Sequence, residues 1–195
     1  MNLSIIVTDS GPLITLAVAQ ALDALLAPKL PVIVPDMVRY EVIRDLDKPG
    51  AREVADWIRF NEPGRVRVAS TEVFEEFEIL RRVNRATKTH NRGEQSAAEV
   101  LSKELELQDH GAILLFEDSM VRKSNFLIRL PDEVVVTSTS EFLFALEEHG
   151  FLTNAAAVLA RAVDVRGNEI LNRHLTGTSE NLEEWPQRIY ARPAG

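Results

Sequence analysis

The sequence predicts an α/β fold with a central, mainly parallel β-sheet. Apolar, strand-like runs alternate with helix-like segments along roughly the first 150 residues, which is the pattern of parallel strands joined by crossover helices. The 195 residues, of which 45% are hydrophobic, suit one domain that can bury a substantial core.

The amino-terminal part is predicted to contain two strands, each followed by a helix. Leu3 to Thr8 is a β-rich apolar run. The Gly11-Pro12 pair then opens a helix that we expect to reach Ala27, because proline is tolerated in a first helical turn. Val32 to Val34 is the second expected strand, and Pro35-Asp36 starts the next helix.

The region from Lys48 to Arg92 is less regular, and we expect it to be an elaboration over the sheet. Its predicted elements are a helix near Arg52 to Phe60, a strand at Val66 to Ala69 and an amphipathic helix at Glu72 to Arg85.

The alternating pattern resumes after this region. Gly93 opens a helix that leads to the strongest later strand, Ala112 to Phe116. The pair Glu117-Asp118 closes that strand and is expected to start a helix that reaches about Leu130. A last core strand is predicted at Val134 to Val136.

The carboxyl-terminal part is predicted to be helical and then weakly ordered. The hydroxyl residues Ser138 to Ser140 suit a helix start, and Gly150 suits the end of the same helix. Residues 151 to 165 form a further expected helix, and the segment after Arg173 is expected to be weakly ordered.

The composition excludes several classes of protein. Without cysteine the chain can form neither disulfides nor a cysteine-based zinc site, and a reducing compartment is its natural setting. The first 27 residues lack a basic n-region, so we interpret them as part of the fold and the protein as cytoplasmic. No apolar run approaches the ~18 residues of a membrane span. A net charge of −8 argues against indiscriminate nucleic-acid binding but permits a local basic groove.

Four acidic residues from separate segments are predicted to meet at one edge of the sheet. Asp9 and Asp118 each follow a strand, where open parallel sheets bind their ligands. Glu41 lies about two helical turns after the second strand, and Glu94 lies in the first turn of the helix before the Ala112 strand. Carboxylates this close repel one another unless they share a cation, and oxygen ligands suit Mg²⁺ or Mn²⁺.

Each acid also has a purely structural explanation. Asp9 and Asp118 could cap the helices that follow them. Glu41 could pair with Arg44 one turn further on, and Glu94 is favoured by the dipole of its helix.

The segments that carry these acids resemble the PIN-domain ribonucleases, particularly the VapC-like toxins of bacterial toxin-antitoxin pairs and their uncharacterised relatives. In chain order they are V-T-D-S-G-P-L-I-T-L-A, V-I-V-P-D-M-V-R-Y-E-V, R-G-E-Q-S-A-A-E-V-L and I-L-L-F-E-D-S-M-V-R-K. A fifth segment, V-V-V-T-S-T-S-E-F-L, is similar to the family's final strand and the hydroxyl-bearing turn that follows it. The resemblance implies a three-layer α/β/α fold in which acids hold one or two divalent ions and RNA phosphodiester bonds are hydrolysed. Residues 1 to 150 would form this PIN-like nuclease domain, and residues 151 to 195 a helical extension and tail packed on or following it.

The resemblance also implies roles for individual residues. Asp9 matches the first acid of the family, Glu41 the second, Glu94 the acid of the Gly-Glu pair and Asp118 the acid after the fourth strand. Ser10 and Thr139 match supporting hydroxyl residues, Glu117 is expected as a neighbour of the site, and Glu99 as a substitute for the acid that many relatives carry where this chain has Ser96. The implied partners are an RNA substrate, an antitoxin protein and a second copy of the chain.

Basic residues beside the acids are candidates for RNA contact. A stretch directly before Gly93 contains Arg81, Arg82, Arg85, Lys88 and Arg92, which could receive the phosphates of a single strand. Arg122 and Lys123, just after Asp118, are similar candidates. The alternative is a solvated helix end, where basic residues are common. Tyr40 could stack on a base, although core packing is the better explanation for it.

The residues argue against two related kinds of protein and leave one alternative to the nuclease open. A phosphatase of the haloacid-dehalogenase type would need a second aspartate where this chain has Gly11, and a receiver domain would need a lysine after the last strand, which is absent between Val134 and Ser140. A non-catalytic PIN-like scaffold or RNA-binding module is the remaining alternative, although a scaffold would have no use for four mutually repelling acids.

Overall fold

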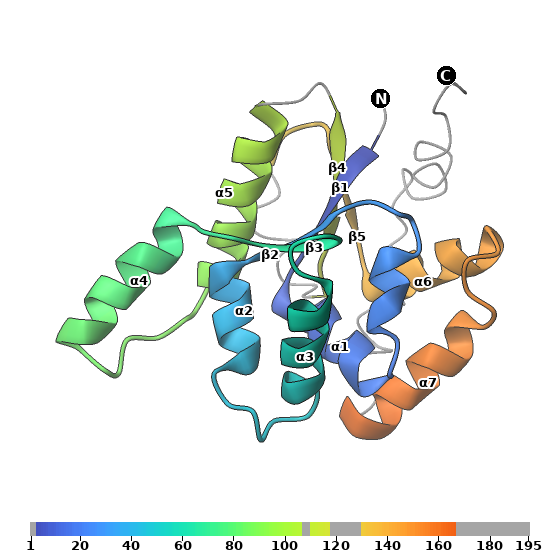
Figure 1. The fold of residues 1–195 in the computed structure, drawn as a ribbon, viewed down its shortest axis with the longest axis horizontal. Helices are drawn as coiled ribbons and strands as arrows, with labels where there is room; N and C mark the ends of the chain where they lie inside the picture. The colour runs from blue at the N-terminus through green and yellow to red at the C-terminus, as the bar shows by residue number, and fades with distance from the viewer. Residues whose placement is uncertain (1–2, 107–109, 118–129, 167–195) are drawn as a thin grey trace.

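The computed structural model describes residues 3–106, 110–117 and 130–166. Their fold is α/β, with one five-stranded sheet in the order β3-β2-β1-β4-β5 and every pairing parallel, as the sequence predicts. Helices cover both faces of this sheet (Figure 1). The strands are β1 Leu3–Thr8, β2 Val32–Pro35, β3 Val66–Ala69, β4 Gly111–Leu115 and β5 Val134–Thr137.

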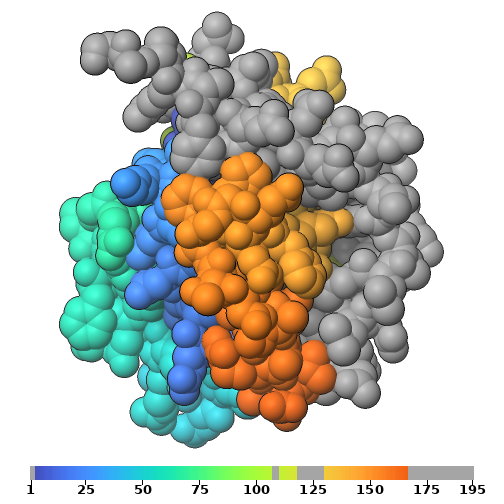
Figure 2. Space-filling model, turned by 90° about the vertical axis from the view of Figure 1, so that its right-hand side faces the viewer, coloured from blue at the N-terminus to red at the C-terminus, as the bar shows by residue number. Residues whose placement is uncertain are grey.

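The helices of the described residues follow the strands in the alternation expected of a parallel sheet. They are α1 Ser10–Val18, the 3₁₀ helix η1 Leu22–Leu26, α2 Asp36–Ile43, α3 Ala51–Asn61, α4 Glu72–Val83, α5 Arg92–Glu106, α6 Thr139–Glu148 and α7 Ala155–Arg166. Figure 2 shows α6 and α7 side by side in orange, next to the blue amino-terminal segments that include α1.

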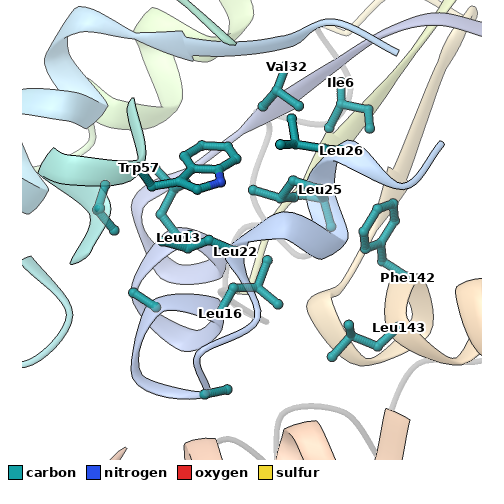
Figure 3. Close-up of a cluster of buried hydrophobic side chains, with 14 of the residues drawn as sticks. Ile6, Leu13, Leu16, Leu22, Leu25, Leu26, Val32, Trp57, Phe142 and Leu143 are labelled. Carbon is teal, nitrogen blue, oxygen red and sulfur yellow. The ribbon is translucent and has the colours of Figure 1, made fainter. Parts of the chain in front are cut away.

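The core has two parts, one on each face of the sheet, because successive side chains of a strand point to opposite faces. In β1, Ile6 belongs to the larger cluster, whereas Ile5 and Val7 belong to the smaller one. The larger cluster contains residues of α1, η1, α3, α6 and α7, and Figure 3 shows Leu13, Leu16, Trp57 and Phe142 packed in it. The smaller cluster is closed by Ala97, Val100 and Leu101 of α5.

Most of the expected boundaries are confirmed to within a few residues. The capping prediction for α6 is also confirmed: Ser138 is the N-cap, and its hydroxyl accepts from the backbone N–H of Glu141, whose carboxylate accepts from the backbone N–H of Ser138 in return. Gly150 follows the C-cap residue with φ +75°, a left-handed conformation that glycine adopts without strain.

Three expectations need correction. The helix expected from Pro12 to Ala27 is interrupted, since α1 ends at Val18, Gln20 adopts φ +54° and a separate 3₁₀ helix follows. The region from Lys48 to Arg92 is more than an elaboration, because β3 is a member of the sheet and pairs with β2 in the register Val32↔Val66. The last helix starts at Ala155 rather than at residue 151.

Two further expectations fall on parts of the chain that are not described. Most of the helix expected between Asp118 and Leu130 lies outside the described residues, as does the segment after Arg173. Within the described part, no helix combines the length and the apolar character that a membrane span requires.

Candidate functional site

The candidate site lies at the carboxyl ends of the central strands β1 and β4. From β1 the chain continues to β2 and β3 on one side, and it later returns to β4 and β5 on the other side. The order of the strands therefore reverses between β1 and β4, and open α/β sheets bind ligands at this kind of switch point. Asp9 follows β1 directly, Glu117 lies just after β4, and Thr139 lies just after β5.

Asp9 and Glu41 approach each other at Gly93, near the start of α5. A Cβ atom built on Gly93 would lie 2.9 Å from Glu41 Oε2 and 3.2 Å from Asp9 Oδ1. Both carboxylate oxygens thus lie within 3.2 Å of a single point, which is filled by any residue larger than glycine. Three segments far apart in the sequence meet here, as the positions of the acids predict.

The environment of Asp9 disfavours its charge. Burial above all, and after it the negative charges of Glu94 and Glu117, raise the pKa of Asp9 from 3.8 to about 7, against the lowering effect of the backbone N–H groups of Ser10 and Gly11. The side chain is held at the mouth of a buried strand, where only 9% of the residue is exposed.

Glu41 shows the same behaviour for the same reasons. Burial above all, and after it the negative charges of Asp9 and Glu94, raise its pKa from 4.5 to about 7, while the Thr89 hydroxyl and Arg44 lower it. The predicted pairing of Glu41 with Arg44 is therefore weaker than the repulsion from the two acids. Glu94, in the first turn of α5, acts on both carboxylates.

This arrangement concentrates negative charge that no described lysine or arginine neutralises by a salt bridge to Asp9, Glu41 or Glu94. Buried charges of one sign are stable only when a cation or a proton compensates them. Carboxylate oxygens are the donors that Mg²⁺ and Mn²⁺ prefer, so the chemistry of the donor set fits a hard divalent cation.

The geometry of a complete metal site is not present in the described part of the chain. Across residues 3–106, 110–117 and 130–166, no group of three or more acidic or histidine side chains is arranged to hold a metal ion. The fourth predicted acid, Asp118, lies outside the described residues, together with the predicted RNA contacts Arg122 and Lys123.

Glu117 occupies a second, cation-compensated cluster beside Asp9. Its Oε2 accepts from the Thr15 hydroxyl at 2.9 Å and from the Arg166 guanidinium at 3.0 Å, and its Oε1 accepts from the Thr139 hydroxyl at 2.5 Å. Arg166 also donates to the Gly11 carbonyl at 3.2 Å and to the Thr15 hydroxyl. A Cβ on Gly11 would lie 3.1 Å from Glu117 Cβ and Oε2, so the small residue permits this close approach.

The Glu117 cluster gives Thr139 a defined role and adds two residues that the sequence did not indicate. Thr139 ties the β5–α6 turn to the segment after β4 through its bond to Glu117. Thr15 and Arg166 come from α1 and α7, and Arg166 is 49 residues from its partner Glu117. No local pattern connects positions so distant, and an arginine near a helix end is ordinarily solvated.

The structure does not bring Glu99 into the site. Its carboxylate accepts from the backbone N–H groups of Glu72 and Val73 at 2.8 and 3.2 Å, and from Lys103 at 2.7 Å. Glu99 thus caps the start of α4, and the prediction that it substitutes for a missing ligand finds no geometric support. Ser96 is buried and donates its hydroxyl to the Gly93 carbonyl of its own helix.

The predicted RNA-binding residues of the stretch before Gly93 contact aromatic rings, line a hollow or face solvent. The guanidinium carbon of Arg81 lies 5.2 Å from the centroid of the Tyr40 ring, and that of Arg92 lies 5.7 Å from the centroid of the Phe77 ring. Arg92 Nη2 also lies 3.8 Å from Glu76 Oε1. Arg81, Arg82 and Arg85 line an open hollow of about 540 Å³ together with Glu78, and Lys88 is exposed. Tyr40 itself packs against Phe74 and Phe77, which supports its interpretation as a packing residue.

Comparison of the chain with models of known protein families and with curated proteins found no match. Its function is therefore inferred from the arrangement of its own residues.

Proposed function

We propose that the protein is a divalent-metal-dependent endoribonuclease that hydrolyses phosphodiester bonds in RNA. The observation that carries this proposal is the convergence of Asp9 and Glu41 on one point beside Gly93, with the pKa of each carboxyl raised to about 7. A fold keeps such a repulsive arrangement at a cost in stability, and a bound divalent cation removes that cost.

Mg²⁺ or Mn²⁺ would be held by Asp9, Glu41 and Glu94, completed by Asp118 from outside the described part. A metal of this kind makes its bound water much easier to deprotonate and stabilises the leaving oxygen, so no nucleophilic side chain is required. Two of the four acids that the resemblance to PIN-domain ribonucleases assigns, Asp9 and Glu41, approach the same point, and the charge of Glu94 acts on both, which supports the proposal.

Basic side chains next to the acids are the proposed contacts for the RNA strand. Arg92 directly precedes Gly93, while Arg85 and Lys88 lie on the exposed segment between α4 and α5. Phosphates placed along this segment would lead the strand towards Gly93 and the carboxylates. We propose a cytoplasmic setting, because a chain without cysteine is suited to a reducing compartment, and an inhibitory antitoxin protein as a partner.

Cleavage of an end-labelled single-stranded RNA tests the proposal. Wild type with Mn²⁺ should cut the RNA, EDTA should stop the cutting, and Asp9→Asn or Glu41→Gln should each reduce the rate by about 100-fold or more. Asp47→Asn is the matched control, because Asp47 pairs with Arg52 on the surface, where its side chain is 91% exposed. Equal rates in wild type, Asp9→Asn and Glu41→Gln would mean that the activity comes from elsewhere.

A non-catalytic scaffold or RNA-binding module is the second candidate function. It is favoured by the absence, among the described residues, of a three-ligand metal group and by the neutralisation of Glu117 by Arg166. A thermal-shift titration with Mn²⁺ separates the two functions, since a metal-binding site raises the melting temperature by mass action and a scaffold without one shows no shift.

A further inference from the structure

The guanidinium of Arg166 lies among oxygen atoms next to the candidate site. Its nitrogen Nη1 donates to the Glu117 carboxylate at 3.0 Å. The same nitrogen donates to the Gly11 carbonyl at 3.2 Å and to the Thr15 hydroxyl. A carboxylate, a carbonyl and a hydroxyl oxygen, which come from the segment after β4 and from α1, thus surround one positively charged group. Hard metal ions take these same kinds of oxygen ligand in proteins.

This oxygen-lined position belongs to the same edge of the sheet as the candidate metal ligands. Glu117 lies just after β4, and Asp9 lies just after β1, the neighbouring strand. The two carboxylates are close enough for the charge of Glu117 to raise the pKa of Asp9. A cation held by Glu117 and the Gly11 carbonyl would therefore be a neighbour of a cation held by Asp9 and Glu41.

Docking of α7 does not by itself explain why the arginine is there. The helix already packs through Val158, Leu159 and Ala162 in the larger core cluster. Among the salt bridges of the described residues, the Glu117 side chain is the most buried acid at 4% exposure, whereas the other acids are at least 16% exposed. A buried ion pair seldom stabilises a fold more than apolar packing would, so this pair is expected to serve the site as well.

We propose that Arg166 takes the place of a second divalent cation, so that the protein works with one bound metal ion. Two-metal phosphodiester hydrolases hold their ions about 3.5 to 4 Å apart, and the two ions together stabilise the attacking and leaving oxygens. In this chain the guanidinium repels a second ion and already satisfies the oxygens that would hold it. The single-ion conclusion rests on the proposed nuclease function, whereas the occupation of a cation-binding position by Arg166 does not.

Replacing Arg166 by methionine should make this position available to a metal ion. The change removes the positive charge and leaves the Glu117 carboxylate, the Gly11 carbonyl and the Thr15 hydroxyl in place. The uncompensated carboxylate then attracts a cation, because a buried charge is stable only when it is compensated. Mn²⁺ is a suitable probe, since oxygen ligands suit it and water can complete its coordination.

The experiment counts the Mn²⁺ ions that each full-length chain binds, by equilibrium dialysis and by isothermal titration calorimetry. Arg166→Met should bind one ion more than wild type. The double variant Glu117→Gln with Arg166→Met should show no such gain, because the carboxylate that would hold the ion is lost. Arg166→Lys should also show no gain, since the ammonium group keeps a positive charge at this position.

Arg161→Met is the matched control on the same helix. Arg161 Nε donates to the Ala19 carbonyl at 2.8 Å, so this residue also ties α7 to α1. Within the described residues Arg161 forms no salt bridge, and its replacement should add no ion. Circular dichroism checks that all variants keep their helix content. Should Arg166→Met fail to fold, Arg166→Gln purified in Mn²⁺ serves instead, because its neutral amide leaves Glu117 uncompensated and the bound ion stabilises the fold by mass action.

The outcomes separate this inference from the proposed function. Equal ion counts in wild type and in a folded Arg166→Met or Arg166→Gln overturn the inference, as does a gain of an ion in Arg161→Met. A wild type that binds two ions overturns it as well. A wild type that binds no Mn²⁺ contradicts the metal-dependent nuclease instead, while one added ion in Arg166→Met would still show that Arg166 occupies a cation-binding position.

Discussion

Replacing Arg166 by methionine should destabilise the protein strongly, although the residue lies at the end of the last described helix. Arg166 is the cationic partner of Glu117, whose side chain is only 4% exposed, against 24% for the arginine side chain. Methionine keeps much of the aliphatic volume and removes the charge. The carboxylate of Glu117 would then keep only the hydroxyls of Thr15 and Thr139 as donors.

The size of the effect follows from the burial of the pair. Removing one partner of a buried ion pair costs about 3 to 5 kcal/mol, because the other charge is left without compensation. Arg166 retains some contact with water, so we expect a value near the lower end, about 3 kcal/mol. For a chain of 195 residues, this corresponds to a fall in melting temperature of roughly 6 to 12 °C.

Urea denaturation followed by circular dichroism measures this free energy by linear extrapolation. The matched control is Arg52→Met, which removes a surface pair whose side chains are 66% and 91% exposed, and which should cost less than about 1 kcal/mol. The double variant Glu117→Gln with Arg166→Met should be more stable than the sum of the single effects predicts, by about 2 kcal/mol. If Arg166→Met costs no more than Arg52→Met, the buried pair does not stabilise the site as we describe.

Three further predictions concern the carboxylates and the core. The pKa of Asp9 is raised from 3.8 to about 7, so the charged form is disfavoured in the folded state and the metal-free protein loses stability as the pH rises from about 4 through 7. Thermal melts in EDTA should give Asp9→Asn a higher melting temperature than wild type at pH 8 and the same melting temperature near pH 4. A difference between the two melting temperatures that is the same at both pH values would contradict this. Gly93→Ala should abolish the Mn²⁺-induced thermal shift, because its Cβ would lie 2.9 Å from Glu41 Oε2, whereas Gly64→Ala, with no atom nearer than 3.9 Å, should leave the shift unchanged. Phe142→Ala should cost about 4 kcal/mol in urea denaturation, since the ring is fully buried; a loss below about 1 kcal/mol would contradict its place in the core.

The sheet could be predicted from sequence because its central strands are apolar on both faces. Apolar residues dominate β1 (L-S-I-I-V-T) and β4 (G-A-I-L-L), in which only Ser4 and Thr8 are polar, as is typical of parallel strands covered on both sides. β3 was harder to place, since its four residues include Arg67 and it lies at the edge. The break after α1 carries no glycine or proline, and Gln20 gives no signal for its positive φ.

The candidate site could be predicted only in part, for a related reason. Asp9 stands directly after a strand, and the topology of a parallel sheet then brings it to an edge shared with other strand ends. The approach of Glu41 to Asp9 depends on how α2 packs against α5. Gly93 permits this close approach, but no pattern in the sequence predicts it. The counter-charge for Glu117 comes from α7, and a pairing across 49 residues has no local signature.

The position of Arg166 also bears on how the protein matures. During synthesis the chain emerges from its amino terminus, so β1 to β5 and α1 to α6 leave the ribosome before α7 does. Until that helix docks on α1 and α6, Glu117 lacks its cation and adds an uncompensated charge beside Asp9. In nascent chains that end before residue 155, the carboxylate of Glu117 would therefore have no arginine to compensate its charge. The negative charge of Glu117 is therefore compensated only late in translation, when the carboxyl-terminal helix α7 has been made.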